Sequence, residues 1–239
     1  MPGWIVPPPK EPTKSRETFR KEREEKVEWL IKQGFLKSER IKKALLKVRR
    51  EAFIPRPYRD YAYLEVPFPL PGEEATISCP HSYPLFYEPL SLNKGHKFLE
   101  VGLGSGYGTA IAREVVGSDG LVVSIEIDPL TFSFAKQNLK NAGYSDVMLV
   151  KGDGGYGYPE FSPYDRICIT AASKEIPIPL IEQLKEGGRL IAPVIEKGIQ
   201  NLVLLEKGDK FINRQLICQV LYVSLRGRFG VNTRKSQQA

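Results

Sequence analysis

Four glycines, at positions 102, 104, 106 and 108, follow a short apolar run in the stretch FLEVGLGSGYG, residues 98–108. Glycine lets a backbone come close to a ligand, and a helix that begins behind such a loop offers free amide donors. Glu126 lies about 20 residues further on, where the next strand is predicted to end, and a carboxylate there can accept hydrogen bonds from both ribose hydroxyls. This spacing predicts a nucleotide-binding turn.

Two further carboxylates extend the predicted site. Asp153 and Gly154, in KGDGG, follow the third predicted strand at the sheet edge where ligands of α/β proteins bind. Glu100 lies inside the first strand, where a buried carboxylate needs a partner, and the ammonium group of a ligand could be that partner. Glu126 could instead end its strand in solvent. A nicotinamide-dependent dehydrogenase is an alternative, although a dinucleotide site more often has an apolar residue at position 100.

The order E-V-G-x-G-S-G-Y resembles the first motif of S-adenosylmethionine-dependent methyltransferases. The resemblance implies that the glycine loop and an acid hold the methionine portion of the cofactor, that Glu126 holds the ribose, and that Asp153 with Gly154 frames the adenine. The cofactor-binding residues expected on this basis are Glu100, Gly102, Leu103, Gly104, Ser105, Gly106, Glu126, Ile127, Asp153 and Gly154.

A second motif, ATISCPHSYP, lies upstream of the glycine loop. It resembles the T-[IV]-S-x-P-H segment of protein-L-isoaspartate O-methyltransferases, enzymes that methylate the misplaced carboxyl of isoaspartyl residues in damaged proteins. The resemblance runs from about residue 25 to residue 230. Further blocks match in the same order, namely KVRREAFIP, YRDYAY, IEIDPLTFSFAKQNLKNAG, KGDGGYGYPEFSPYDRICITAA, IPIPLIEQLKEGGRLIAPV and LYVSLRG.

The family resemblance implies a role for Ser78, which matches the serine that contacts the reacting carboxylate. Its neighbours in the implied substrate site are Thr76, Ile77, Pro80 and His81. A carboxylate is ionised at neutral pH and needs no general base, so methyl transfer to it depends mainly on alignment in a dry site. By residue type alone, Ser78 would be a turn hydroxyl that caps backbone, His81 a structural residue and Cys79 a small buried residue.

Departures from the family pattern cluster in the acceptor half of the chain. Glu74 and Ala75 replace the usual Gly-Gln before the Thr-Ile-Ser, and Ser82 and Tyr83 follow the Pro-His where methionine and small or polar residues are usual. Ser224 replaces a proline. The chain is therefore interpreted as a divergent member, and a changed acceptor remains an alternative.

Strand and helix patterns alternate from residue 97 onward. Five strands are predicted in KFLEV, LVVSIEI, DVMLV, YDRICIT and RLIAPV, and helices in YGTAIAREVVG, PLTFSFAKQNLKNAG and PLIEQLKEGG. Parallel strands need such crossover helices, which favour a sheet covered on both faces. The run after Val194 has a Gly208-Asp209 turn between strand-like segments and predicts an antiparallel edge. The expected fold is α/β, a Rossmann-like class I methyltransferase fold with a helical N-terminal extension.

Three regions are predicted along the chain. Residues 1–12 form a proline-rich extended arm, residues 13–96 hold N-terminal helices and the substrate loop, and residues 97–239 form the S-adenosylmethionine-binding domain. Residues 13–239 are expected to be one compact unit. One helix is predicted from Thr13 to about Gln33 and another from Ser38, its N-cap, whereas the many prolines of residues 54–84 predict an ordered loop without a helix.

Composition restricts the remaining possibilities. The net charge of +7 would suit nucleic acid, but the N-terminal segment KSRETFRKEREEKVEWLIKQG alternates acids with bases, which is typical of a solvated helix with internal ion pairs. Cys79, Cys168 and Cys218 have no paired spacing, so neither a disulfide framework nor a metal site is predicted. No apolar run of about 18 residues and no secretory signal is present, so a cytoplasmic monomer without a membrane role is expected.

Three functions follow from these observations. The preferred one is S-adenosylmethionine-dependent methylation of the free carboxylate of L-isoaspartyl or D-aspartyl residues, which starts repair of damaged proteins through a succinimide. The second keeps the cofactor but has another acceptor such as RNA. The third is a cofactor-binding interaction module without catalysis.

Overall fold

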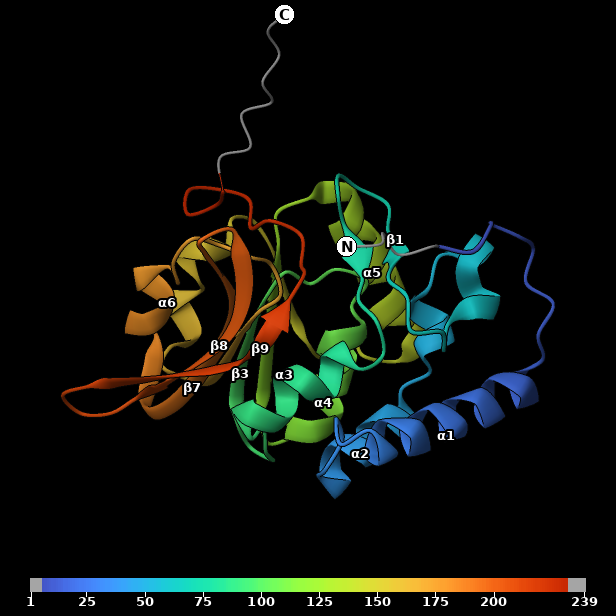
Figure 1. Ribbon diagram of the computed structural model, residues 1–239, viewed down its shortest axis with the longest axis horizontal. Helices are drawn as coiled ribbons and strands as arrows, with labels where there is room; N and C mark the ends of the chain where they lie inside the picture. Colours follow the sequence, from blue (N-terminus) through green and yellow to red (C-terminus); the bar gives the residue numbers. More distant parts are fainter. Residues whose placement is uncertain (1–5, 232–239) are drawn as a thin grey trace, which may run out of the picture.

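One seven-stranded sheet organises the computed structural model, which describes residues 6–231 (Figure 1). In space the strands follow the order β5-β4-β3-β6-β7-β8-β9. They are β3 (Lys97–Val101), β4 (Leu121–Glu126), β5 (Met148–Lys151), β6 (Tyr164–Ile169), β7 (Leu184–Glu196), β8 (Ile199–Lys207) and β9 (Ile212–Val220). The strands from β5 to β7 in this order are parallel, whereas β8 and β9 are antiparallel to their neighbours. The predicted mostly parallel sheet with an antiparallel C-terminal edge is confirmed.

Helices cover both faces of the sheet, as the alternation of patterns predicted. Side chains alternate along each strand, so that Phe98 of β3 packs in one apolar cluster and Leu99 in the other. Helix α6 (Ile178–Glu182) packs against the second cluster through Leu180. The first cluster is covered by α1 (Arg16–Lys32), α2 (Glu39–Lys47), α3 (Ser82–Leu90), α4 (Tyr107–Val116) and α5 (Pro129–Ala142).

Some charges of α1 are paired within the helix and others with residues outside it, such as Lys26 with Glu65. Ser15 caps its start with its side chain, and Gly34, with a φ of +77°, follows its end. The Arg20 guanidinium lies 2.6 Å from a Glu17 carboxylate oxygen and 2.9 Å from one of Glu24. The predicted internal ion pairs are confirmed at Arg20, on the exposed side of the helix.

The start of α2 is tied to α3. Ser38 occupies the N-cap position, as predicted, but its hydroxyl does not cap the helix. It donates instead to Glu88 on α3 at 3.0 Å, and the N–H groups of Lys37 and Ser38 reach the same carboxylate oxygen at 2.8 Å each. One carboxylate thus fixes the entry into α2.

The expectation that residues 54–84 contain no helix is wrong at the C-terminal end of that stretch. Helix α3 begins at Ser82 and contains two prolines, Pro84 and Pro89. Pro84 lies in the first turn, where a missing N–H removes no bond of the helix. Phe86, Tyr87 and Leu90 are buried, so tertiary packing outweighs the low helix propensity of proline. The rest of the stretch contains the 3₁₀ helix η2 (Arg56–Tyr61) and a short hairpin of β1 (Phe68–Pro69) with β2 (Thr76–Ile77). Another 3₁₀ helix, η1 (Arg50–Phe53), directly precedes the stretch.

The predicted helix in PLIEQLKEGG is wrong in extent. Helix α6 ends at Glu182, and β7 begins two residues later. Leu184 already pairs with Tyr164 of β6, whose N–H donates to the carbonyl of Gln183 at 2.8 Å. Gly187, with a φ of +72°, also does not suit a helix. The long β7 therefore takes the second half of the predicted helix.

The N-terminal arm contacts the 3₁₀ turn η2. Residues 6–12 contain neither helix nor strand, and Lys10 donates its N–H to the carbonyl of Pro57 at 2.9 Å. Residues 1–5 of the predicted arm lie outside the described residues, and the division of the chain after residues 12 and 96 stays a prediction. Across residues 6–231, no helix combines the length and apolar character that crossing a membrane would require.

Candidate active site

The residues predicted to hold a nucleotide meet at the carboxyl edge of three adjacent strands. The glycine loop follows β3, Glu126 ends β4, and Asp153 follows β5. Because β5, β4 and β3 are parallel neighbours, their carboxyl ends lie side by side. The sheet topology therefore brings together groups that lie about 50 residues apart in the sequence.

The glycine loop needs glycine at two positions for space as well as for conformation. Gly102, Gly104 and Gly106 all have positive φ, at +97°, +56° and +85°. A Cβ on Gly102 would lie 2.2 Å from the Thr170 hydroxyl, and one on Gly106 would lie 2.9 Å from a Leu139 side-chain carbon. Gly104 differs, because the nearest atom to its Cβ position is the carbonyl oxygen of Thr76 at 3.8 Å. The middle of the glycine loop thus faces the predicted substrate segment.

Leu103 and Ser105 are buried residues between the glycines of the loop. Their exposed fractions are only 3% and 4%. The Ser105 hydroxyl accepts the N–H of Tyr107 at 3.3 Å, and its carbonyl accepts from the Asn138 amide at 3.0 Å. Contacts of either side chain with a cofactor stay a prediction.

Glu126 links the end of β4 to the glycine loop. One carboxylate oxygen accepts the N–H of Gly104 at 3.1 Å, and the other accepts the N–H of Asp128 at 3.0 Å. Burial raises the pKa of Glu126 above its ordinary value, although these backbone donors oppose the shift. Glu126 and the next residue, Ile127, are half-buried, so the glutamate does not simply end its strand in solvent. Its carboxylate retains acceptor capacity for ligand hydroxyls.

Glu100 finds its partners inside the protein. Its exposed fraction is 2%, and one carboxylate oxygen accepts from the hydroxyls of Thr109 at 2.6 Å and Ser124 at 2.7 Å. Burial raises the pKa of Glu100 to about 7, although the two hydroxyl donors oppose that shift. The partner that a buried carboxylate requires is therefore available without a ligand, and contact with a cofactor ammonium group stays a prediction.

Asp153 is bonded to a C-terminal segment that sequence patterns did not place in the site. Its carboxylate accepts the N–H of Gly155 at 2.9 Å and that of Arg228 at 2.7 Å. Gly154 must be glycine, because a Cβ there would lie 2.5 Å from a Val101 methyl group. The LYVSLRG block was the signal that residues near 228 matter, but nothing in the sequence says that they reach Asp153.

A second contact of the C-terminal segment joins it to the substrate segment. Arg226 lies 3.3 Å from the Asp128 carboxylate and 3.4 Å from that of Glu73. The Asp128 carboxylate also accepts the N–H of Glu73 at 3.2 Å and caps α5. Hydrogen bonds, led by that from the Thr131 N–H, hold the pKa of Asp128 at about 2. Residues 71–76 and 225–230 thus flank the nucleotide edge from two sides.

The predicted substrate residues lie in different environments. Thr76 is exposed, Ile77 and Pro80 are buried, and Ser78 and His81 are half-buried. The Ser78 carbonyl accepts from the Arg50 guanidinium at 2.7 Å. Within residues 6–231 the Ser78 hydroxyl forms no hydrogen bond, so it is not the backbone-capping hydroxyl that residue type alone would indicate.

His81 belongs to a polar group beside Ser78. Its Nδ1 atom lies 2.6 Å from a Glu65 oxygen, and the other Glu65 oxygen lies 3.2 Å from the Lys26 ammonium. Cys79 completes a trio of possible metal ligands with Glu65 and His81, whose ligand atoms all lie within 4.8 Å of one another. The Lys26 charge already neutralises Glu65, and burial raises the pKa of the Cys79 thiol to about 11. These contacts favour a hydrogen-bonded structural pair over a metal site.

Comparisons with known proteins identify the family of the chain. The model of the family "Protein-L-isoaspartate(D-aspartate) O-methyltransferase" matches residues 21–230. The chain is 43% identical over 227 residues to the protein-L-isoaspartate O-methyltransferase of Hyperthermus butylicus, with 91% of this chain and 94% of that protein covered. It is 44% identical over 214 residues to the enzyme of the same name from Methanopyrus kandleri, with 89% and 94% covered.

Solved structures give the same result. A structure of a protein-L-isoaspartate O-methyltransferase matches with a TM-score of 0.80 at 37% identity, covering 87% of this chain and 67% of that chain. A Plasmodium falciparum structure in complex with S-adenosyl-L-homocysteine matches with a TM-score of 0.77 at 24% identity and shows the same fold. These matches confirm the Rossmann-like methyltransferase fold, and the chain belongs to the protein-L-isoaspartate (D-aspartate) O-methyltransferase family.

Proposed function

We propose that this chain transfers a methyl group from S-adenosylmethionine to the free carboxyl of L-isoaspartyl or D-aspartyl residues in damaged proteins. One structural observation supports the acceptor assignment above others. The unbonded Ser78 hydroxyl lies in the segment that begins opposite Gly104, so the acceptor segment and the glycine loop are neighbours. A methyl donor on the loop and an acceptor beside Ser78 would then be close together.

The cofactor would lie along the carboxyl edge of β3, β4 and β5. The glycine loop offers close backbone approach to the methionine portion, and Glu126 offers acceptors for the ribose hydroxyls. Asp153 and Gly154 would frame the adenine, because the Asp153 carboxylate keeps lone pairs beyond its two backbone donors. The cofactor supplies a methyl group on a positively charged sulfur, which is the electrophile.

The protein has little chemistry to perform beyond alignment. A carboxylate oxygen forms the new C–O bond while the C–S bond breaks, and both electrons of that bond stay on sulfur in S-adenosylhomocysteine. The Ser78 hydroxyl would donate to the other carboxylate oxygen and orient the nucleophile. Methylation turns the carboxylate into an ester whose methoxide can leave. The next backbone amide nitrogen therefore attacks the ester carbonyl, methoxide leaves with the amide proton as methanol, and a succinimide forms.

The test uses a peptide with one isoaspartyl residue and its aspartyl twin. We expect incubation with methyl-labelled cofactor to place base-labile label on the isoaspartyl peptide and none on the aspartyl twin. Label on neither peptide would contradict the proposed acceptor. Salt-sensitive transfer to RNA, measured in the same assay, would instead support the alternative acceptor.

The proposal includes a monomer that acts in the cytoplasm. The exposed ion pairs of Arg20 with Glu17 and Glu24 on α1 support a surface of mixed charge, which favours a protein acceptor over nucleic acid. Light scattering after size exclusion should give the mass of one chain, 26.9 kDa. A mass of two or more chains would contradict this part of the proposal.

A further inference from the structure

Arg50 is a buried cation without a carboxylate partner. Its exposed fraction is 1%, and no carboxylate of residues 6–231 lies within ion-pair distance of its guanidinium. Its Nη1 atom is buried and has no hydrogen-bond partner among these residues. Burying an unpaired charge costs free energy, so a chain that retains one there needs a specific use for it.

The guanidinium bridges two backbone segments of the acceptor half. Its Nε donates to the carbonyl of Ala62 at 2.6 Å, and its Nη2 donates to the carbonyl of Ser78 at 2.7 Å. The second bond fixes the peptide plane that joins Ser78 to Cys79. It therefore restrains the backbone from which the Ser78 hydroxyl projects, while leaving that hydroxyl free.

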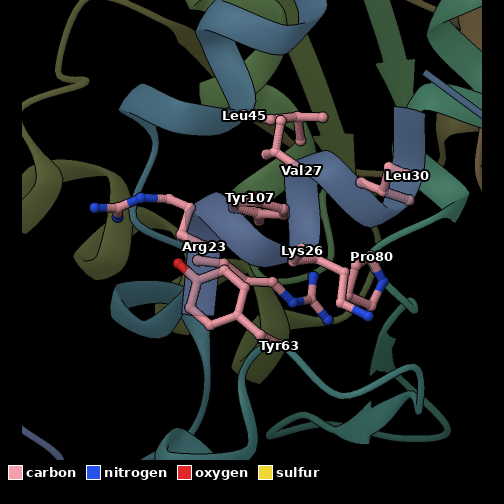
Figure 2. A pocket seen from close by; sticks show the side chains of 9 residues that line it. Arg23, Lys26, Val27, Leu30, Leu45, Tyr63, Pro80 and Tyr107 are labelled. Carbon is pink, nitrogen blue, oxygen red and sulfur yellow. The ribbon is translucent and has the colours of Figure 1, made fainter. Parts of the chain in front are cut away.

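The same guanidinium also contacts the cofactor half. Its central carbon lies 5.2 Å from the ring centre of Tyr107, the first residue of α4 after the glycine loop, and 5.7 Å from that of Tyr83. The rings of Tyr83 and Tyr107 pack edge to face, with their centroids 4.7 Å apart. Figure 2 shows Tyr107, Tyr63 and Pro80 around the cavity that Arg50 also lines, and its volume of about 10 Å³ leaves room for about one water molecule. Arg50 is thus packed tightly between the two halves.

We infer that Arg50 is a positioning residue for the methyl transfer: it fixes Ser78 relative to the start of α4, and so the acceptor carboxylate relative to the sulfonium methyl. This inference rests on the proposed function. Lysine could not replace arginine here, because one ammonium group cannot reach the two carbonyls that Nε and Nη2 contact and lie over the Tyr107 ring at once. The structural account therefore requires the guanidinium and not just the charge.

The test compares R50M and R50K with R166M as a matched control. Arg166 lies on strand β6, away from Ser78, and is half-buried. It donates to the carbonyl of Leu90 at the end of α3 and to that of Asp165. R166M therefore loses an arginine and two backbone contacts without touching the site. For R50M we expect kcat about 10- to 100-fold below wild type with the affinity for S-adenosylhomocysteine unchanged, and for R50K a partial loss. R166M should keep wild-type kcat.

A second measurement does not depend on turnover. Amide hydrogen exchange of residues 76–81 should be faster in R50M than in wild type and unchanged in R166M. The inference is overturned if R50M keeps wild-type kcat and exchange, or if R50M and R166M lose kcat equally. If R50M does not fold, the same two measurements on R50K test the inference. Wild-type kcat and exchange in R50K would contradict a role for the guanidinium. A wild-type enzyme that methylates no isoaspartyl peptide refutes the proposed function, whereas the exchange comparison still tests Arg50.

Discussion

Two side chains at the proposed active site have environments that are unusual for their residue types. Glu100 is a carboxylate without access to water whose pKa is raised to about 7 by burial. Ser78 is a half-buried hydroxyl with no hydrogen bond in residues 6–231. In the proposed function, a cofactor ammonium group near Glu100 would lower its pKa, and the Ser78 hydroxyl would donate to the acceptor carboxylate.

Removing the Ser78 hydroxyl should slow transfer without weakening cofactor binding. A hydrogen bond to a carboxylate contributes roughly 1.5–3 kcal/mol, so S78A should lower kcat/KM for an isoaspartyl peptide about 10- to 100-fold. Steady-state kinetics and calorimetry with S-adenosylhomocysteine separate the two effects. S118A, an exposed serine in the turn before β4, is the control. Equal losses in S78A and S118A would refute the assigned role.

Cofactor binding should release a proton from Glu100 if the ammonium group lies near it. A nearby positive charge lowers the pKa of a carboxylate, so at pH 7 a partly protonated Glu100 would ionise on binding. Calorimetry of S-adenosylhomocysteine in buffers of different ionisation enthalpy measures this release. We expect it to be absent in E100Q and retained in E39Q, a change at an exposed residue of α2. No release in wild type would place the ammonium group away from Glu100.

Residue patterns predicted the nucleotide edge but not the residues that support it. Glycines with positive φ and strand-end acids have local signals, which is why Gly102, Glu126 and Asp153 could be predicted to meet at one edge of the sheet. Arg50 could not, because a base within KVRREAF has the pattern of a surface charge and its burial depends on partners such as Ser78. Long-range contacts of this kind leave no trace in local spacing.

At the scale of elements, two short segments pack beside the strand ends that form the proposed cofactor site. The segment of residues 71–76 is fastened to the start of α5, where the Thr131 hydroxyl donates to the carbonyl of Pro71 at 2.7 Å. The segment of residues 225–230 reaches Asp153 and Asp128. Helix α3 then follows the acceptor residues and anchors them through its buried face.

The turn at Gly227 should control cofactor affinity. Its φ is +94°, and a Cβ there would lie 2.3 Å from the Asp153 carboxylate. G227A should therefore displace Asp153 and weaken S-adenosylhomocysteine binding about five- to tenfold, the loss of about one hydrogen bond. G198A is the matched control, since Gly198 has a φ of +79° and open space around it. If both variants bind equally well, the C-terminal segment does not support the adenine end.

Elements were predicted where periodicity and packing agree, and missed where they compete. The strands β3, β4 and β6 have local apolar runs and were found. Helix α3 was missed because prolines oppose it locally while Phe86 and Leu90 stabilise it through the core. The second half of the helix predicted before β7 was wrong because strand pairing to β6 begins at Leu184.

At the scale of the whole molecule, the acceptor half and the cofactor half share one apolar core. Phe19 of α1, Phe86 of α3 and Ile111 of α4 belong to the same cluster on one face of the sheet. The distance between Ser78 and the glycine loop therefore depends on the packing of the whole N-terminal region. A change of global stability should affect both halves together.

The charge of Glu100 should make global stability depend on pH. Its pKa is raised from 4.5 to about 7 in the folded chain, so the folded state binds more protons than the unfolded state between these values. Stability contributed by protonated Glu100 is complete below about pH 4.5 and is lost as pH rises through about 7. This difference in pKa corresponds to a change of about 3 kcal/mol in the free energy of unfolding. Denaturant unfolding at pH 5 and pH 8 should show a lower free energy of unfolding at pH 8 in wild type and no such difference in E100Q. An equal change of the unfolding free energy with pH in both proteins would contradict this prediction.

A crystal structure with S-adenosylhomocysteine and an isoaspartyl peptide tests the central claim most directly. We expect the cofactor sulfur over the glycine loop, its ribose on Glu126, and the free carboxylate of the isoaspartyl residue within hydrogen-bond distance of the Ser78 hydroxyl, with one oxygen directed at the sulfur. A peptide carboxylate bound elsewhere, with Ser78 unbonded, would contradict the account.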